Sequence, residues 1–187
     1  MKNILYKDLL EQSKKTIKEA QERVKNTYAT IDPQLFNKKP APKSWSAGQC
    51  LEHLVITGEG YLKQFEQKIP QAIDNKVIAN PNAEFNSGFF GNYILKIVDP
   101  NYPKKNPTTK AFTPKHNPVP LTMVEDFLKL QDKWLQWIDK SQQLDLMKVK
   151  ITSPALFIIQ FRLGDVFVIN ANHQIRHLNQ ADRAMKS

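Results

Sequence analysis

Hydrophobic spacing is the feature of this sequence that most constrains its fold. Apolar residues recur at three- and four-residue steps through four long segments, and no convincing run of residues alternates between polar and apolar as a half-buried β-strand would. Four long helices without strands predict an all-α protein, a four-helix bundle. The four segments cover residues 3–30, 46–69, 122–138 and 164–185.

Local signals predict where these helices begin and end. Pro33 ends the first helix, because proline cannot continue the backbone hydrogen bonding of a helix. The second and third helices are each expected to start at a capping box, in which a hydroxyl and a side chain three residues later bond free backbone N–H groups. These boxes pair Ser46 with Gln49 and Thr122 with Glu125.

A long connection, residues 70–120, separates the second helix from the third. It carries eight of the twelve prolines, so most of it should be irregular, with one short helix at residues 89–98. A connection of this length either lines a functional site or crosses over the surface, and the sequence leaves both roles open. The chain, residues 1–187, is expected to form a single domain in which long connections act as crossovers.

The net charge of +9 comes from 27 basic and 18 acidic residues. Such a charge favours encounters with phosphates and other anions. The lysines are scattered along the chain, however, and do not form the block expected of a nucleic-acid-binding arm. We therefore expect a solvated basic surface, and we do not expect nucleic acid as a partner.

No segment predicts secretion or membrane attachment. Residues 1–14 lack the apolar core of a signal peptide, because Asp8 and Glu11 lie among the apolar residues. The longest apolar stretch, residues 155–169, is too short and too polar to span a bilayer. The sole cysteine, Cys50, cannot form an intramolecular disulfide, so nothing points to an oxidising compartment. A cytoplasmic protein is expected.

Two histidines one helical turn apart, His173 and His177, give the best indication of function. Residues four apart share a helix face, so both imidazoles can reach one bound atom, and a metal ion is the first hypothesis. A pair of solvated histidines on an exposed helix is the alternative. Two candidates remain for a third ligand: His116, in a proline-bracketed loop that favours exposure, and His53, at the margin of a buried helix face.

The residues around these histidines form recognisable motifs. Residues 45–54 read Trp-Ser-Ala-Gly-Gln-Cys-Leu-Glu-His-Leu, and residues 173–178 read His-Gln-Ile-Arg-His-Leu. In this order they resemble the DinB/YfiT-like superfamily, a group associated with metal-dependent enzymes. The resemblance covers nearly the whole chain and includes the stretches 89–91, 112–114 and 153–154.

The resemblance implies a four-helix bundle, often a homodimer, with a divalent metal held by one histidine of the second helix and two of the fourth. His53, His173 and His177 match these three positions. Three neutral imidazoles suit zinc, nickel or iron(II), and they leave a coordination position open for water or substrate. Relatives include thiol-dependent S-transferases and isomerases, and many members have no established substrate.

The leading expectation is a metal-dependent enzyme that transfers a low-molecular-weight thiol to a small electrophile, because relatives are known for such chemistry and a metal can hold sulfur as thiolate. A metal-dependent hydrolase of small esters or amides is the alternative. It should carry a second base near the metal, and the sequence identifies none. A non-catalytic metal-binding or stress-response module is the alternative of another class. The expected partner is a small-molecule substrate.

Residues next to the histidines carry weaker indications. Glu52 lies about 100° around the helix from the histidine that follows it, so the two should not share a site. Arg176 either anchors an anion or covers the helix surface, and the surface role is favoured. Asn170 and Asn172 are candidates for orienting an imidazole. Cys50 lies in an apolar stripe, where an inert core thiol is expected in place of a soft metal ligand.

Overall fold

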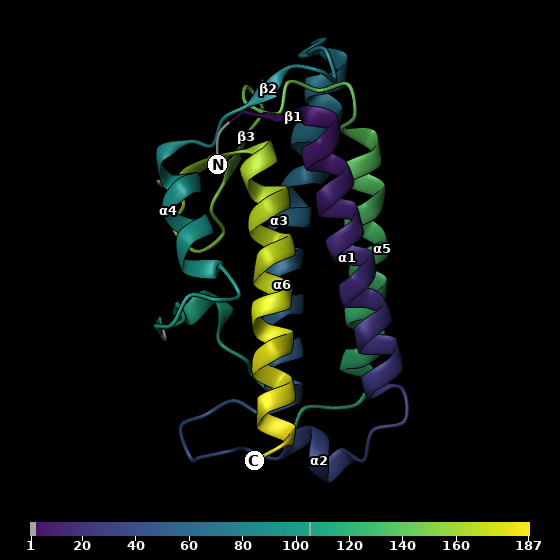
Figure 1. The fold of residues 1–187 in the computed structure, drawn as a ribbon, viewed down its shortest axis with the longest axis vertical. Helices are drawn as coiled ribbons and strands as arrows, with labels where there is room; N and C mark the ends of the chain where they lie inside the picture. Colours follow the sequence, from purple (N-terminus) through teal and green to yellow (C-terminus); the bar gives the residue numbers. More distant parts are fainter. Residues whose placement is uncertain (1–2, 105) are drawn as a thin grey trace.

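The computed structural model describes residues 3–104 and 106–187, and helices dominate it (Figure 1). In chain order the elements are β1 (Ile4–Leu5), α1 (Tyr6–Tyr28), α2 (Pro33–Asn37), α3 (Ala47–Asp74), β2 (Glu84–Phe85), α4 (Phe89–Val98), the 3₁₀ helix η1 (Lys110–Phe112), α5 (Thr122–Lys140), β3 (Lys150–Thr152), β4 (Gln160–Arg162) and α6 (Leu163–Met185).

The four long helices pack as a bundle. Helix α3 lies against both α5 and α6, and α1 lies against the same two helices from the other side. Figure 1 shows α1 and α6 running from top to bottom, while α3 and α5 run from bottom to top. The predicted all-α bundle is confirmed. Among the described residues, no helix has both the length and the apolar character that a membrane span requires.

Helices α3 and α5 run parallel, and this arrangement forces a long connection between them. The chain leaves α3 at the top and must return to the bottom before α5 can begin (Figure 1). It returns on the α6 side, where α4 packs against α6. A Cβ atom at Gly91 of α4 would lie only 2.3 Å from the carboxylate of Asp165 in α6, so glycine permits this close approach.

The two predicted capping boxes have different outcomes. The box at Ser46 is confirmed, because Gln49 N–H donates to Ser46 Oγ at 3.2 Å and Ser46 N–H donates to Gln49 Oε1 at 3.3 Å. The box at Thr122 was wrong. Helix α5 does begin there, but its N-cap is Leu121, without a capping side chain. The turn before the helix already supplies backbone carbonyl acceptors for the first N–H groups, so the hydroxyl has no such role.

Helix α3 is longer than the sequence predicts, and the small sheets were missed. The expected end was residue 69, yet α3 continues through Pro70 to Asp74. Proline removes one intrahelical hydrogen bond, but burial of Ala72 extends the apolar face beyond it. The β1–β2 and β3–β4 pairs have strands of two or three residues, which are too short to show polar and apolar alternation.

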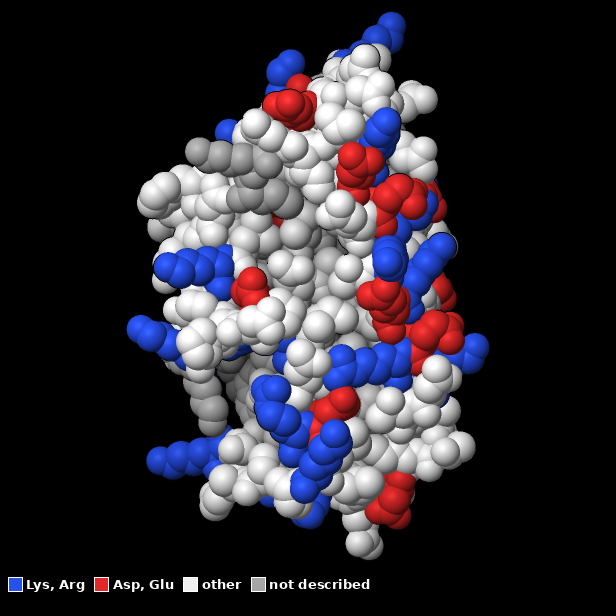
Figure 2. All heavy atoms as spheres, viewed as in Figure 1, with Lys and Arg blue, Asp and Glu red and all other residues white. Residues whose placement is uncertain are grey.

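An aromatic cluster from three helices occupies the core. Phe65 of α3, Trp134 of α5 and Phe167 of α6 meet edge to face, with ring centroids 5.1 to 6.4 Å apart. On the surface, Figure 2 shows acidic side chains lying among the basic ones along the α1 side of the face drawn. Positive charge on that side is therefore interspersed with negative charge, and does not form one uniform block.

Candidate metal site

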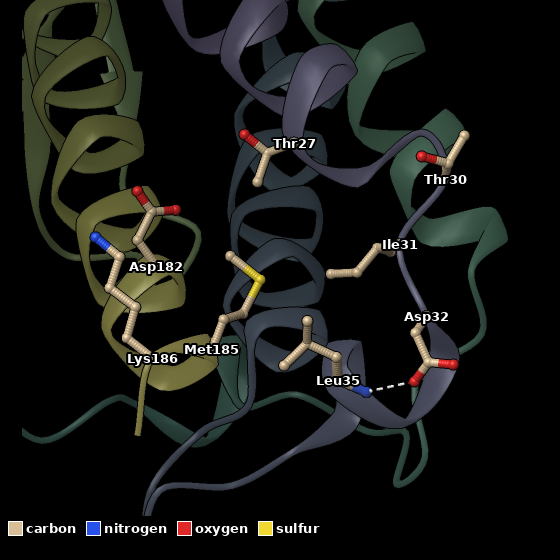
Figure 3. A pocket seen from close by; sticks show the side chains of 8 residues that line it. All are labelled: Thr27, Thr30, Ile31, Asp32, Leu35, Asp182, Met185 and Lys186. Carbon is tan, nitrogen blue, oxygen red and sulfur yellow. Dashed lines mark hydrogen bonds between the residues drawn. The ribbon is translucent and has the colours of Figure 1, made fainter.

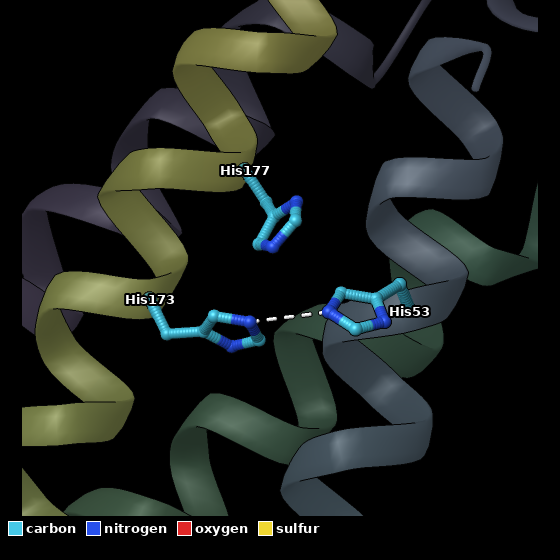
Figure 4. A group of neighbouring side chains, drawn as sticks. All are labelled: His53, His173 and His177. Carbon is cyan, nitrogen blue, oxygen red and sulfur yellow. Dashed lines mark hydrogen bonds between the residues drawn. The ribbon is translucent and has the colours of Figure 1, made fainter. Parts of the chain in front are cut away.

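Three histidines converge between α3 and α6 (Figure 4). His53 comes from α3, and His173 and His177 come from successive turns of α6. One ligand nitrogen of each histidine lies within 4.8 Å of those of the other two. The ring centroids are 4.5 to 4.9 Å apart. The structure therefore brings together the three side chains that the sequence singled out, whereas their role as ligands stays a prediction.

The distances and the donor type fit a divalent metal ion. The Nε2 atoms of His53 and His173 are 3.1 Å apart, so both can bond one ion at about 2.0–2.1 Å, the usual length of a zinc–imidazole bond. Imidazole also suits nickel and iron. The cluster is thus compatible with a bound divalent metal, and three ligands leave at least one further position for water or substrate.

Burial keeps the three imidazoles neutral near pH 7. Desolvation lowers the pKa of His53 from its usual value. It lowers the pKa of His173 and that of His177 much further, and the neighbouring imidazoles and the Arg176 guanidinium add to this effect by disfavouring another positive charge. A neutral imidazole retains the lone pair that a metal requires, so ion binding need not first displace protons from charged rings.

A backbone carbonyl orients His53. Its Nδ1 lies 2.8 Å from the carbonyl oxygen of Phe112, which can only accept a hydrogen bond, so Nδ1 carries the proton. The other ring nitrogen, Nε2, then presents its lone pair toward the cluster. Such a contact fixes the tautomer and the ring orientation of a metal-binding histidine.

Two aromatic rings lie against the cluster. The Trp45 ring lies 4.9 Å from the His53 ring and 5.9 Å from the His177 ring, centroid to centroid. The Phe112 ring meets His53 edge to face at 6.4 Å. The sequence offered Trp45 only as part of a family motif. Phe112 likewise entered only within the stretch 112–114 of the family resemblance, and its contact with His53 was not predicted, because that residue acts through its backbone carbonyl and residue type does not reveal such contacts.

Residues 99–104 and 106–118 lie between α4 and α5, and we call them the strap segment. The first part of this segment contacts α6 and its last part contacts α3, the two helices that carry the histidines. Arg176 of α6 fastens its first part. The guanidinium donates hydrogen bonds to the carbonyl oxygens of Asp99, Tyr102 and Lys104 at 2.9, 2.9 and 2.7 Å. Arg176 therefore reaches from the helix surface to the strap, a contact that neither of its two expected roles included.

Glu52 of α3 fastens the last part of the strap segment. One carboxylate oxygen accepts hydrogen bonds from Lys115 N–H at 2.9 Å and from His116 Nδ1 at 2.7 Å. The other oxygen accepts from His116 N–H at 3.2 Å. The alternative third ligand, His116, therefore lies outside the cluster and pairs with Glu52. As expected, Glu52 does not join the three histidines, but it holds the loop beside them.

Three other residues contribute no ligand to the cluster. Cys50 is fully buried in the core, and burial raises the pKa of its thiol to about 12, so the thiolate that binds metals is disfavoured. In the part of the chain that the structure describes, no hydrogen bond joins Asn170 or Asn172 to a histidine ring. The orienting contact comes from the Phe112 carbonyl instead.

A separate pocket lies at the end of the bundle, among α1, α2 and the last turns of α6 (Figure 3). Its volume is about 460 Å³, and none of the three clustered histidines lines it. The carboxylate of Asp32 caps α2, and that of Asp182 binds Arg23 and Tyr28, so both are already engaged. The residues that line the pocket are Thr27, Thr30, Ile31, Asp32, Leu35, Asp182, Met185 and Lys186.

The fold and the site together define a class: helical bundles in which histidines of two antiparallel helices meet at a cluster able to hold a divalent metal. The comparison with family profiles agrees with this class. The profile of the DinB superfamily matches residues 16–181, and the chain belongs to that superfamily. No curated protein and no solved structure shows a significant match to the chain.

Proposed function

We propose that the protein is a metal-dependent enzyme in which His53, His173 and His177 hold one divalent ion, zinc or nickel in preference to iron. The convergence of three neutral imidazoles, with ligand nitrogens within 4.8 Å of one another, carries the proposal. Structural zinc sites usually have four protein ligands, whereas three ligands leave room for a reactant. A chain of 187 residues with an extensive apolar core does not require a metal to fold.

The proposed reaction is transfer of a low-molecular-weight thiol to a small electrophile. Likeness to superfamily members that transfer small thiols supports this choice, and the net charge of +9 favours an anionic thiol. A bound divalent ion would supply the Lewis acidity that keeps a thiol deprotonated near pH 7. The Phe112 carbonyl holds His53 in the tautomer whose Nε2 can bind a metal, and the Trp45 and Phe112 rings pack against the His53 ring.

Metal content tests the site itself. The wild type, purified without chelator and incubated with Zn²⁺ or Ni²⁺, is expected to retain close to one ion per chain by elemental mass spectrometry. His173→Ala should retain far less, because two imidazoles hold an ion much more weakly than three. Asn172→Ala is the matched control on the same helix and should behave as the wild type. Equal occupancy in the wild type and in His173→Ala would contradict the proposed metal site.

Turnover tests the reaction. The metal-loaded protein is mixed with a halogenated aromatic electrophile and with each of several small thiols in turn, and release of halide is followed. Thiol-dependent release that disappears in His173→Ala would support the proposed transfer. Hydrolysis of a nitrophenyl ester without any thiol would assign the hydrolase function instead. Full metal occupancy without either reaction would favour the non-catalytic metal-binding module.

A further inference from the structure

The strap segment is held at two places, in each case by a residue that directly precedes a candidate ligand. Arg176 precedes His177 on α6, and Glu52 precedes His53 on α3. Neither charged group belongs to the cluster of ligand nitrogens. Each reaches outward to the strap, so the helix turns that carry the histidines also hold the chain that crosses between them.

The carboxylate of Glu52 is buried, and both of its oxygens accept hydrogen bonds from the strap segment. The residue is 2% exposed, and its carboxylate accepts bonds from two backbone N–H groups and one imidazole N–H of residues 115 and 116. Gln49, one turn earlier on α3, adds a contact of 3.4 Å from its Nε2 to the carbonyl oxygen of His116. A carboxylate with this many charge-assisted bonds fixes the position of the backbone that it holds.

A short tether joins that backbone to the group that orients His53. Only Thr113 and Pro114 separate Phe112 from Lys115, and proline fixes its own φ. Phe112 also ends the 3₁₀ helix η1, which contacts α3. Because the tether is short and stiff, the position of the Phe112 carbonyl depends on the position of Lys115 and His116.

We propose that Glu52 is a positioning residue for the metal site: by holding the backbone at Lys115 and His116, it keeps the Phe112 carbonyl on Nδ1 of His53 and so keeps Nε2 free to bind metal. The metal-affinity part of this inference rests on the proposed function, whereas the tautomer part does not. Glu52 acts through the loop and does not touch the ligand nitrogens. Groups that orient a ligand in this way typically change metal affinity by about 10- to 100-fold.

A second carboxylate provides a matched control. Asp145 accepts a side-chain bond from Tyr6 Oη at 2.9 Å and two backbone bonds, from Met147 N–H and Lys148 N–H at 3.1 Å each, and its other oxygen lies 3.4 Å from the ammonium of Lys148. The loop that it holds leads into β3 and does not contact the histidines. Asp145→Asn should therefore perturb a loop in the same manner as Glu52→Gln without changing the orientation of His53.

The experiment compares the wild type, Glu52→Gln and Asp145→Asn. In the metal-free proteins, ¹⁵N NMR of the imidazoles reports which nitrogen of His53 is protonated. Titration with Co²⁺, followed by its visible absorption, gives the affinity. We expect Nδ1–H of His53 in the wild type and in Asp145→Asn, and a mixture of tautomers in Glu52→Gln, with affinity reduced about 10- to 100-fold only in Glu52→Gln.

A second variant, Pro114→Gly, tests the same proposal in case Glu52→Gln does not fold. It loosens the tether while leaving the contacts of Glu52 in place, and it should shift the His53 tautomer in the same direction by a smaller amount. An unchanged tautomer in a folded Glu52→Gln, or in Pro114→Gly if that protein alone folds, would overturn the proposal. So would equal losses of affinity in Glu52→Gln and Asp145→Asn. If the wild type binds no Co²⁺, the proposed function fails, and the tautomers of the metal-free proteins still decide the role of Glu52.

Discussion

Glu52 and Asp145 hold loops by the same chemistry in two regions of the molecule. Each is a nearly buried carboxylate that accepts bonds from two consecutive backbone N–H groups, and it also pairs with side chains: His116 for Glu52, and Tyr6 and Lys148 for Asp145. Residues 147–148 are followed by β3, whose Ile151 packs in the core. Residues 115–116 lie three and four positions after Phe112, whose carbonyl orients His53. Similar local bonding therefore has different consequences according to what the held backbone contacts next.

Loss of a ligand should give the largest effect and sets the scale for both carboxylates. His177→Ala is expected to weaken Co²⁺ binding by more than 100-fold, beyond the range of about 10- to 100-fold for groups that only orient a ligand. Affinity is measured by competition with a chromophoric chelator. Asn172→Ala serves again as the control on α6. A loss no greater than that of Glu52→Gln would contradict the assignment of His177 as a ligand.

Removal of the second carboxylate should affect stability alone. Asp145→Ala leaves the Tyr6 hydroxyl and two N–H groups without their acceptor, at a cost of about 2–3 kcal/mol in the free energy of unfolding. The melting temperature should fall by roughly 4–12 °C, since 1 kcal/mol corresponds to about 2–4 °C in a domain of this size. Co²⁺ affinity should stay within about twofold of wild type, well below the effect of a group that orients a ligand. A larger loss of affinity would break the contrast between the two regions.

Substitution of Arg176, which holds the first part of the strap segment, should have a smaller, local effect. Arg176→Lys keeps the charge, but an ammonium group cannot reproduce the guanidinium fork that spans three carbonyls. Amide hydrogen exchange in residues 99–104 should accelerate about tenfold, equivalent to the loss of one or two hydrogen bonds. Exchange in residues 147–149, held by Asp145, serves as the internal control. Acceleration in both regions would indicate general loosening of the fold.

Acid should reveal the smallest effect, at Asp145. Burial alone raises the pKa of this carboxyl, but bonds from Tyr6 and from two backbone amides outweigh burial and lower its pKa. A pKa below that of the unfolded chain means that the carboxylate stabilises the fold fully above about pH 4, and that this contribution is lost as the pH falls through the folded pKa. The stability difference between wild type and Asp145→Asn, measured by urea unfolding, should therefore shrink in acid. A difference independent of pH would contradict this.

Local patterns predicted the helices and the histidine pair because both depend on spacing along the chain. The apolar stripes placed the four long helices, and a four-residue interval put His173 and His177 on one helix face. The residues alone could not choose between His53 and His116 for the third position. That choice depends on packing between α3 and α6, and it was the family resemblance that indicated His53.

The contacts that organise the site could not be predicted, because they join distant residues and use the backbone. Glu52 and His116 are 64 positions apart, and His53 meets a carbonyl 59 positions away. The helix face correctly put Glu52 outside the cluster, but it gave no sign of the loop that Glu52 holds. The error at Thr122 has a similar origin, because carbonyls of the preceding turn satisfy the N–H groups that the predicted box was meant to cap.

The connection between the parallel helices α3 and α5 contains more residues than the distance between its ends requires. Helix α3 has 28 residues and is therefore about 42 Å long at 1.5 Å per residue. About a dozen extended residues would be enough to return over that length, yet the chain uses every residue from 75 to 121. The surplus is not needed to close the bundle. The extra residues are instead available for contacts with the helices, such as the hydrogen bonds that join residues 112, 115 and 116 to His53 and Glu52.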